Sequence, residues 1–155
     1  HDIEIDISSN KIIFYIDNLI LISKLIDGNF PDYTRVIPKN NNNHLIINRS
    51  NLLSAVDRVS TISNEKSPSI KFKLYKNLVN LSTINNENST ATEDIEAKYE
   101  GKEIEIGFNS KYIMDILDNL AGDEIKISFN DNSTPIIAQE KSDQDIIYVL
   151  MPMRV

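Results

Sequence analysis

Hydrophobic and polar positions alternate along the first part of the chain. Residues 3–7 alternate isoleucine with acidic side chains, and two further apolar runs follow at 12–16 and 19–26. Successive side chains of a strand point to opposite faces, so a period of two predicts strands. Polar turn residues separate the three runs. We therefore expect three strands within residues 1–27, followed by an extended linker at 28–38 that has prolines near both ends.

After the linker, one order of elements is predicted twice: a strand, a helix and three strands. In the first copy the strands are expected at 44–48, 69–75, 78–84 and 92–99, with the helix at about 50–63. In the second copy they are expected at 103–108, 124–129, 134–139 and 146–151, with the helix at about 110–120. This duplication predicts an α+β fold in which the helices pack on one face of an antiparallel sheet.

Both predicted helices have a polar residue at the start and an apolar stripe. Ser50 is the expected N-cap of the first helix and Asn109 of the second. Apolar residues recur at helical spacing, which indicates the side that faces the core. The first stripe consists of Leu52, Ala55, Val56, Val59 and Ile62, and the second of Ile113, Ile116, Leu117 and Leu120.

Composition narrows the class of protein. The 155 residues are 41% hydrophobic, enough to form a core, and no apolar run approaches the roughly 20 residues of a membrane span. The absence of cysteine and of a signal-like N-terminus favours a cytoplasmic location. The net charge of −7 argues against a simple basic nucleic-acid binder, since affinity for DNA comes from cations that neutralise phosphates.

Catalytic chemistry has little support in the sequence. The chain has two histidines, and it has no Gly-rich phosphate loop, zinc-ligand spacing or nucleophile elbow. The pairs Glu103/Glu105 and Glu93/Asp94 could bind a metal or act as acid and base, but solvated strand faces and edges are the favoured interpretation. No metal and no cofactor are expected. The alternative function is a small carboxylate-dependent hydrolase on a β-rich scaffold, for which three acidic side chains clustered in a cleft would be evidence.

Several segments resemble the bacterial DNA polymerase III beta subunit, the replicative sliding clamp. They are Phe30-Pro-Asp-Tyr-Thr-Arg-Val-Ile-Pro38, Ser63-Asn-Glu-Lys66, Glu105-Ile-Gly-Phe-Asn109 followed by Tyr112, and Tyr148-Val-Leu-Met-Pro-Met-Arg-Val155. The resemblance is colinear over essentially all 155 residues. It implies a DNA-clamp fold, with residues 1–33 as the last strands and linker of the middle clamp domain and 34–155 as the third domain. Because the chain starts at His1 within a strand, we expect it to be the C-terminal part of a longer protein.

The resemblance also implies a function without catalysis. A sliding clamp is a processivity factor: a homodimeric ring that encircles double-stranded DNA with weak direct contact. It tethers the polymerase, the clamp loader and repair proteins through peptides that enter a pocket near the C-terminus. A ring that surrounds DNA without gripping it is compatible with an acidic chain, and no membrane association is implied.

The implied peptide pocket lies around the C-terminal tail. Methionines are adaptable and polarizable, and the guanidinium of Arg154 offers a planar set of donors near the chain end. By resemblance the pocket consists of Pro31, Val36, Asn109, Tyr112, Val149, Met151, Met153 and Arg154. It also uses middle-domain residues that would precede His1. The competing interpretation is that Val149 and Met151 fill the core and Arg154 is only a terminal charge.

Two further surfaces are predicted. Arg58, Lys66 and Lys111 lie opposite the apolar stripes or beside a helix end, and could face DNA phosphates in a ring. Plain solvation of a helix face is the alternative for each, and nearby aspartates weaken any tight contact. By resemblance, the subunit interface takes the end of the first helix and an acidic strand edge, here Thr61, Ile62, Glu87, Glu93 and Asp94. A core position is the alternative for Ile62.

Overall fold

The computed structural model describes residues 2–63, 68–85, 89–143 and 145–154, which form two compact units. The first unit ends at Asp32 and the second begins at Tyr33. This division falls one residue before the boundary between residues 33 and 34 that the resemblance implies.

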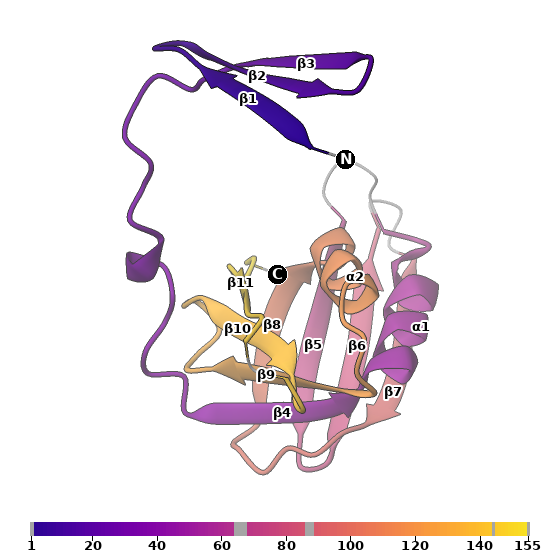
Figure 1. The fold of residues 1–155 in the computed structure, drawn as a ribbon. Coiled ribbons are helices and arrows are strands. Elements are labelled where there is room, and N and C mark those ends of the chain that lie inside the picture. Colours follow the sequence, from indigo (N-terminus) through magenta and orange to yellow (C-terminus); the bar gives the residue numbers. More distant parts are fainter. Residues whose placement is uncertain (1, 64–67, 86–88, 144, 155) are drawn as a thin grey trace. The chain divides into compact units, whose positions relative to one another are not determined.

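The first unit is a three-stranded antiparallel sheet in the order β1-β2-β3 (Figure 1). The strands are β1 (Ile3–Ile7), β2 (Lys11–Ile16) and β3 (Leu19–Lys24), as the apolar runs predict. Most of its apolar side chains are exposed, and Ile13 is the one buried apolar side chain in the described part of this unit. The following linker is not uniformly extended as expected, because Tyr33–Arg35 forms a 3₁₀ turn.

The second unit contains two helices and eight strands among its described residues, and the duplicated order of elements is confirmed. Its first copy consists of β4 (Asn43–Asn48), α1 (Arg49–Ser60), β5 (Ser69–Tyr75), β6 (Leu78–Ile84) and β7 (Thr90–Glu96). Its second copy consists of β8 (Ile104–Asn109), α2 (Ser110–Asp118), β9 (Glu124–Phe129), β10 (Ile136–Glu140) and β11 (Tyr148–Leu150). The α+β class is thus confirmed.

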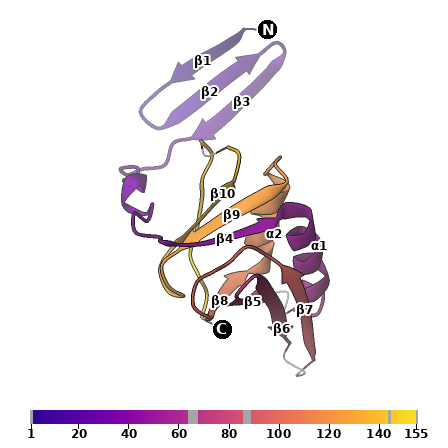
Figure 2. The same ribbon diagram turned by 90° about the horizontal axis from the view of Figure 1, so that it is seen from below.

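The two copies exchange their first strands. One sheet has the order β11-β10-β9-β4 and the other the order β7-β6-β5-β8, with every pairing antiparallel. Strand β4 therefore completes the sheet of the second copy, and β8 that of the first. The sequence predicts one sheet, whereas the structure has two, with both helices on the same side of them (Figures 1 and 2). The exchange ties the two copies into one core.

The core draws on both sheets and both helices. Alternate residues of the central strands are buried: Ile70, Phe72 and Leu74 of β5, Val79, Leu81 and Thr83 of β6, and Ile125, Ile127 and Phe129 of β9. The rings of Phe72 and Phe108 meet edge to face, with their centroids 5.1 Å apart and their planes at 82°. Both predicted helix stripes are buried except at Ile62, which lies beyond the end of α1 and is half-buried.

Both helices begin with an asparagine N-cap at the end of the preceding strand. Asn48 ends β4 and caps α1 by accepting a hydrogen bond from the backbone N–H of Asn51 at 3.0 Å. The expected cap, Ser50, is wrong: this residue lies in the first turn and its hydroxyl donates to the side-chain oxygen of Asn48 at 2.8 Å. Asn109 caps α2 as predicted, accepting from the N–H of Lys111 at 3.0 Å. An asparagine at a strand end can leave the sheet and begin a helix in one residue.

The largest error in the predicted strands concerns β7. The sequence predicts a strand at 92–99, but β7 covers Thr90–Glu96 and the chain then changes partner. The N–H of Lys98 donates to the carbonyl of Ile46 at 2.8 Å, and the N–H of Ile46 donates to the carbonyl of Lys98 at 3.0 Å. This bridge joins the segment after β7 to β4 of the other sheet. Smaller errors shorten the expected strand at 146–151 to β11 and shift the one at 134–139 to β10.

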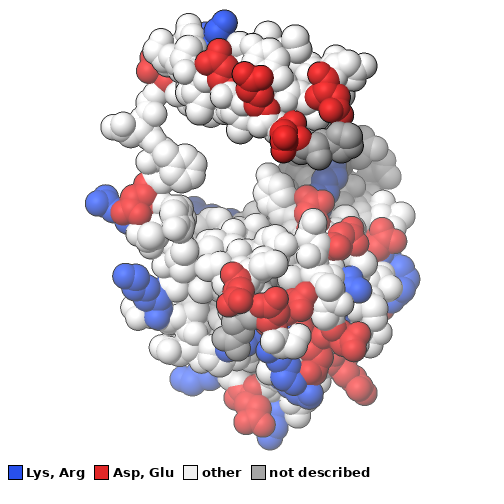
Figure 3. All heavy atoms as spheres, viewed as in Figure 1, with Lys and Arg blue, Asp and Glu red and all other residues white. Residues whose placement is uncertain are grey.

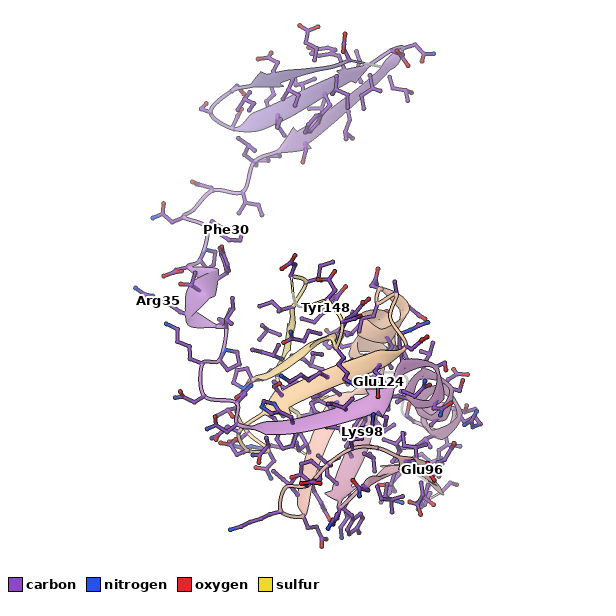
Figure 4. All side chains as sticks on the ribbon, turned by 60° about the horizontal axis from the view of Figure 1, so that its bottom comes forward. Phe30, Arg35, Glu96, Lys98, Glu124 and Tyr148 are labelled. Atoms are coloured by element: carbon purple, nitrogen blue, oxygen red, sulfur yellow. The ribbon has the colours of Figure 1, made fainter. Side chains whose placement is uncertain are left out.

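An ion-pair group crosses this junction. Glu124 on β9 lies 2.9 Å from the Nζ of Lys98 and 2.5 Å from the Nζ of Lys141. Figure 4 shows Lys98 and Glu124 on neighbouring segments of the second unit. The ammonium group of Lys141, followed by that of Lys98, lowers the pKa of Glu124 to about 2.

We expect this group to contribute to acid stability. A carboxyl whose pKa is lower in the folded chain stabilises it above the ordinary value near 4.5, and the contribution is lost as the pH falls toward 2. Glu124→Gln should therefore reduce the drop in melting temperature between pH 5 and pH 2.5, by a few degrees at most because the pairs are exposed. Glu100→Gln, at an exposed position outside the strands, is the control. An unchanged pH dependence in Glu124→Gln would contradict the assignment.

Candidate functional site

The C-terminal tail leaves the core immediately after a short strand. Leu150 is 8% exposed and packs into the core, whereas Val149 is 37% and Met151 58% exposed. Alternation along β11 explains the difference, because Val149 points away from the face that Leu150 buries. The interpretation of Val149 and Met151 as core fillers is therefore wrong.

Beyond Pro152 a backbone hydrogen bond holds the tail. The N–H of Met153 donates to the carbonyl of Gly107 on β8 at 2.8 Å. Strand β8 is the edge of its sheet, so it has a free side for this bridge. Met153 and Arg154 are thus placed beside β8, although β11 belongs to the other sheet.

A hollow of about 340 Å³ lies between α2 and β11, and we call it the helix hollow. Its lining consists of Tyr112, Asp115, Ile116, Asn119, Tyr148, Val149 and Leu150. Helical spacing places Tyr112, Asp115, Ile116 and Asn119 on one side of α2. Tyr112 is 56% exposed, so an apolar surface remains open there. The structure therefore brings together two of the predicted pocket residues, Tyr112 and Val149.

A second hollow, of about 390 Å³, adjoins the tail and is called the tail hollow. Glu105, Gly107, Asn132, Ser133, Met153 and Arg154 line it. The turn that carries Asn132 and Ser133 is fixed by Asp131, whose carboxylate accepts hydrogen bonds from the backbone N–H groups of Ser133 and Thr134, each at 2.8 Å. These bonds and those from the two hydroxyls lower the pKa of Asp131. Met153 and Arg154 are thus brought together beside an ordered turn.

The remaining predicted pocket residues occupy different places. Asn109 is half-buried as the N-cap of α2, and Met151 is exposed between β11 and Pro152. Val36 belongs to the second unit and is 59% exposed just after the 3₁₀ turn, whereas Pro31 belongs to the first unit. The pocket roles of all eight residues stay predictions.

Sequence reasoning missed several lining residues of the helix hollow. Asp115, Ile116 and Asn119 follow Tyr112 at intervals of three, four and seven residues, which is the spacing of one helix face. Helical spacing from Tyr112 therefore predicts these three residues as its neighbours. Tyr148 also lines this hollow, although the sequence predicts it only as part of the tail.

The predicted DNA-facing and interface residues are partly linked to each other. Arg58 on α1 and Glu93 on β7 form a two-pronged ion pair, with Nε–Oε2 at 3.0 Å and Nη2–Oε1 at 2.5 Å. This contact lowers the pKa of Glu93 and raises that of Arg58. Arg58, predicted to face DNA, and Glu93, predicted to lie at the subunit interface, are therefore partners in one ion pair, and their charges cancel locally. Lys66 lies outside the described residues.

Lys111 occupies the start of α2, where it is exposed. It lines a shallow hollow of about 230 Å³ with residues from both helices, among them Asp57 and Thr61. The carboxylate of Asp57 thus lines the same hollow as this cation. Figure 3 likewise shows acidic side chains interspersed with basic ones on the face in view.

The interface residues lie at the end of α1 and along β7. Thr61 is the exposed C-cap of α1. Asp94 points to the opposite face of β7 from Glu93 and accepts a hydrogen bond from the amide of Asn80 at 2.6 Å. Strand β7 is an edge of its sheet, and the interface roles of these residues stay predictions. Glu87 lies outside the described residues.

Neither a metal centre nor a membrane segment emerges from the described part of the chain. Within it, no three histidine, cysteine or acidic side chains gather into a group that could hold a metal ion. No helix in the same residues has the length and apolar character needed to cross a membrane.

Comparison with known proteins identifies the class to which this fold and tail belong. The pattern of the family described as "DNA polymerase III beta subunit, C-terminal domain" matches residues 34–154. The beta sliding clamp of Caulobacter vibrioides is 39% identical over 153 residues, which are 99% of this chain and 41% of that protein. That of Escherichia coli K12 is 35% identical over 152 residues, or 98% of this chain and 42% of that protein.

Solved structures of sliding clamps also superpose on this chain. The sliding clamp of Bartonella birtlesii bound to griselimycin superposes with a TM-score of 0.90 at 40% identity, covering 99% of this chain and 41% of that one. The Pseudomonas aeruginosa sliding clamp with a ligand superposes with a TM-score of 0.88 at 31% identity, covering 99% of this chain and 42% of that one. The chain belongs to the DNA polymerase III beta subunit family, and the DNA-clamp fold is confirmed. It spans about two fifths of the length of these relatives, and nothing in the comparisons supports the hydrolase alternative.

Proposed function

We propose that the chain serves as part of a sliding clamp, a non-catalytic processivity factor of DNA replication in the cytoplasm. Family membership supports this proposal, as does the exposed apolar surface at the tail. The clamp would encircle double-stranded DNA and hold the polymerase, the clamp loader and repair proteins through their clamp-binding peptides. The observation that carries the proposal is the helix hollow, in which exposed Tyr112 and Val149 face the same open space.

The peptide would bind along the tail. Its apolar anchor would contact Tyr112, Val149 and Met151, with Met153 and Arg154 beside it. Val36 of the linker and Asn109 would complete this part of the pocket. An apolar hollow with a few polar groups at its rim is the usual form of such a site. Flexible methionines would allow related peptides to bind in the same place.

Contact with DNA would be weak. Arg58, Lys66 and Lys111 would face the phosphates, but Arg58 shares its charge with Glu93 and Lys111 shares a hollow with Asp57. Strong phosphate binding needs several unopposed cations. A protein that encloses DNA as a homodimeric ring does not need them.

The ring would close through the edge of β7 and the end of α1. An edge strand presents unpaired backbone groups to a strand of a neighbouring subunit. Thr61, Ile62, Glu87, Glu93 and Asp94 would lie at this contact.

Calorimetric titration with a short peptide that carries a Leu-Phe anchor tests the proposed function. We expect binding to the 155-residue chain, and Tyr112→Ala should weaken it by about tenfold or more, because burial of a large aromatic side chain contributes roughly 1.5–3 kcal/mol. Tyr112 is 56% exposed, so its loss should leave the fold intact.

Tyr75→Ala is the matched control, because Tyr75 lies on β5 outside the helix hollow, with the Nζ of Lys73 5.3 Å from its ring centroid. It should leave the peptide affinity unchanged. Equal weakening by both variants, or none by Tyr112→Ala, would refute the proposed anchor site.

A further inference from the structure

A third hollow lies on the face of the sheet β7-β6-β5-β8 that points away from the core, and we call it the sheet hollow. Its volume is about 420 Å³, and its lining includes Ser69, Lys71, Ser82, Thr90, Thr92 and Arg154. Ser69, Lys71 and Ser82 occupy half-buried positions that alternate with core residues along β5 and β6. No acidic side chain is found among the described residues that line this hollow, whereas Lys71 and Arg154 are cations. Most of the other polar side chains that line it carry hydroxyl groups.

Acidic side chains lie at the margins of the sheet hollow and are already engaged. The carboxylate of Glu105 on β8 lies 3.2 Å from the Nζ of Lys71 and 3.3 Å from that of Lys73, with one oxygen toward each. Asp94 accepts the hydrogen bond from Asn80. In a chain of net charge −7 the sheet hollow is therefore a local site with cations and donors and, among its described lining residues, without a carboxylate of its own. Charge complementarity favours an acidic occupant.

The sheet hollow shares a lining residue with the proposed peptide site. Arg154 lines both the sheet hollow and the tail hollow. Ser69, at one end of the sheet hollow, is the register partner of Asn109, which begins the helix that carries Tyr112. Paired strands lie about 4.8 Å apart, and an extended peptide advances about 3.3 Å per residue. Two or three residues beyond an anchor near Asn109 therefore reach the sheet hollow.

We propose that the sheet hollow is an extension of the peptide site that binds an acidic side chain of the partner peptide, outside its apolar anchor. Lys71 and Arg154 would hold the carboxylate, with the hydroxyls of Ser69 and Thr90 as further donors. This inference rests on the proposed function and adds a determinant of partner choice. Partners with an acidic residue beside the anchor would be preferred over those with a neutral one.

Fluorescence anisotropy with the 155-residue chain tests the inference. The probes are the labelled Leu-Phe anchor peptide and versions extended at either end by two aspartates or by two asparagines, which have nearly the same shape. We expect the aspartate extension at one end to bind about three- to fivefold tighter than its asparagine counterpart, as exposed charge pairs allow. Raising the salt from about 0.05 to about 0.5 M should remove most of this advantage.

Lys71→Gln should abolish the aspartate advantage and leave the affinity for the unextended anchor unchanged. Lys73→Gln is the matched control: the residue has the same charge, lies two positions along the same strand face and contacts the same Glu105, but does not line the sheet hollow. It should keep the advantage. Equal binding of aspartate and asparagine peptides to the parent chain, or equal losses in both lysine variants, would overturn the inference while the anchor site stands. Failure of the unextended anchor to bind would overturn both proposals.

Discussion

Phe72→Ala is expected to lower the free energy of unfolding of the second unit by about 3–5 kcal/mol, the usual result of truncating a fully buried aromatic residue. Phe72 is 1% exposed on the central strand β5 and packs edge to face against Phe108, which is also 1% exposed. The two residues lie on neighbouring strands, and one of these, β8, comes from the other copy of the duplicated unit. The cavity would thus open where the exchanged strand is held.

Urea unfolding followed by far-ultraviolet circular dichroism measures this effect. Phe30→Ala is the matched control, because Phe30 lies in the linker and is 85% exposed (labelled in Figure 4). Its substitution should change stability by less than about 0.5 kcal/mol. A loss below about 1 kcal/mol for Phe72→Ala would contradict this packing of the core.

Deletion of Met153–Val155 is expected to reduce affinity for the Leu-Phe peptide by about 10- to 100-fold or to below detection, while the fold persists. The loss of affinity follows from removing Met153 and Arg154, since burial of one methionine side chain contributes roughly 1.5–3 kcal/mol. The fold should persist because the deletion breaks the backbone hydrogen bond from Met153 to Gly107, which is worth only about 1 kcal/mol. The core position of the last strand, Leu150, remains.

Calorimetric titration and a thermal melt of each variant separate these effects. Ile136→Ala is the comparison variant, in which stability rather than peptide affinity should be lost. Ile136 is fully buried, pairs with Leu150 in the β10–β11 register and does not line the helix or tail hollow. It should lower the melting temperature by many degrees, with the peptide affinity of the folded fraction kept. A deletion variant that melts far earlier, or that binds the peptide as tightly as the parent, would refute the assignment of the tail.

Local sequence patterns predicted much of the fold. The strands 69–75, 78–84 and 124–129 were predicted with their observed bounds, since alternation with a period of two is a direct consequence of strand geometry. Asn109 was recognised as a cap, but Asn48 was missed in favour of Ser50. Both asparagine and serine can cap a helix, and the choice depends on where the preceding strand ends.

The sequence predicted only part of the candidate site. The tail residues and Tyr112 were singled out by resemblance, and the α2 positions around Tyr112 follow from helical spacing. The sequence could not place Arg154 in the same hollow as Lys71, because one residue comes from the tail and the other from β5. Nor could it show that Arg58 and Glu93, 35 residues apart, form an ion pair.

By itself the sequence determined the kinds and order of the elements, the duplication, and which side of each helix faces the core. These properties depend on backbone geometry and on neighbours a few residues away. The tertiary structure alone decided that β4 and β8 exchange sheets, that the segment around Lys98 leaves β7 to pair with Ile46, and that Val149 is exposed while Leu150 is buried. These outcomes depend on contacts between residues far apart in the chain, where several antiparallel partners satisfy the same alternating pattern, and only the packing of the whole core selects among them.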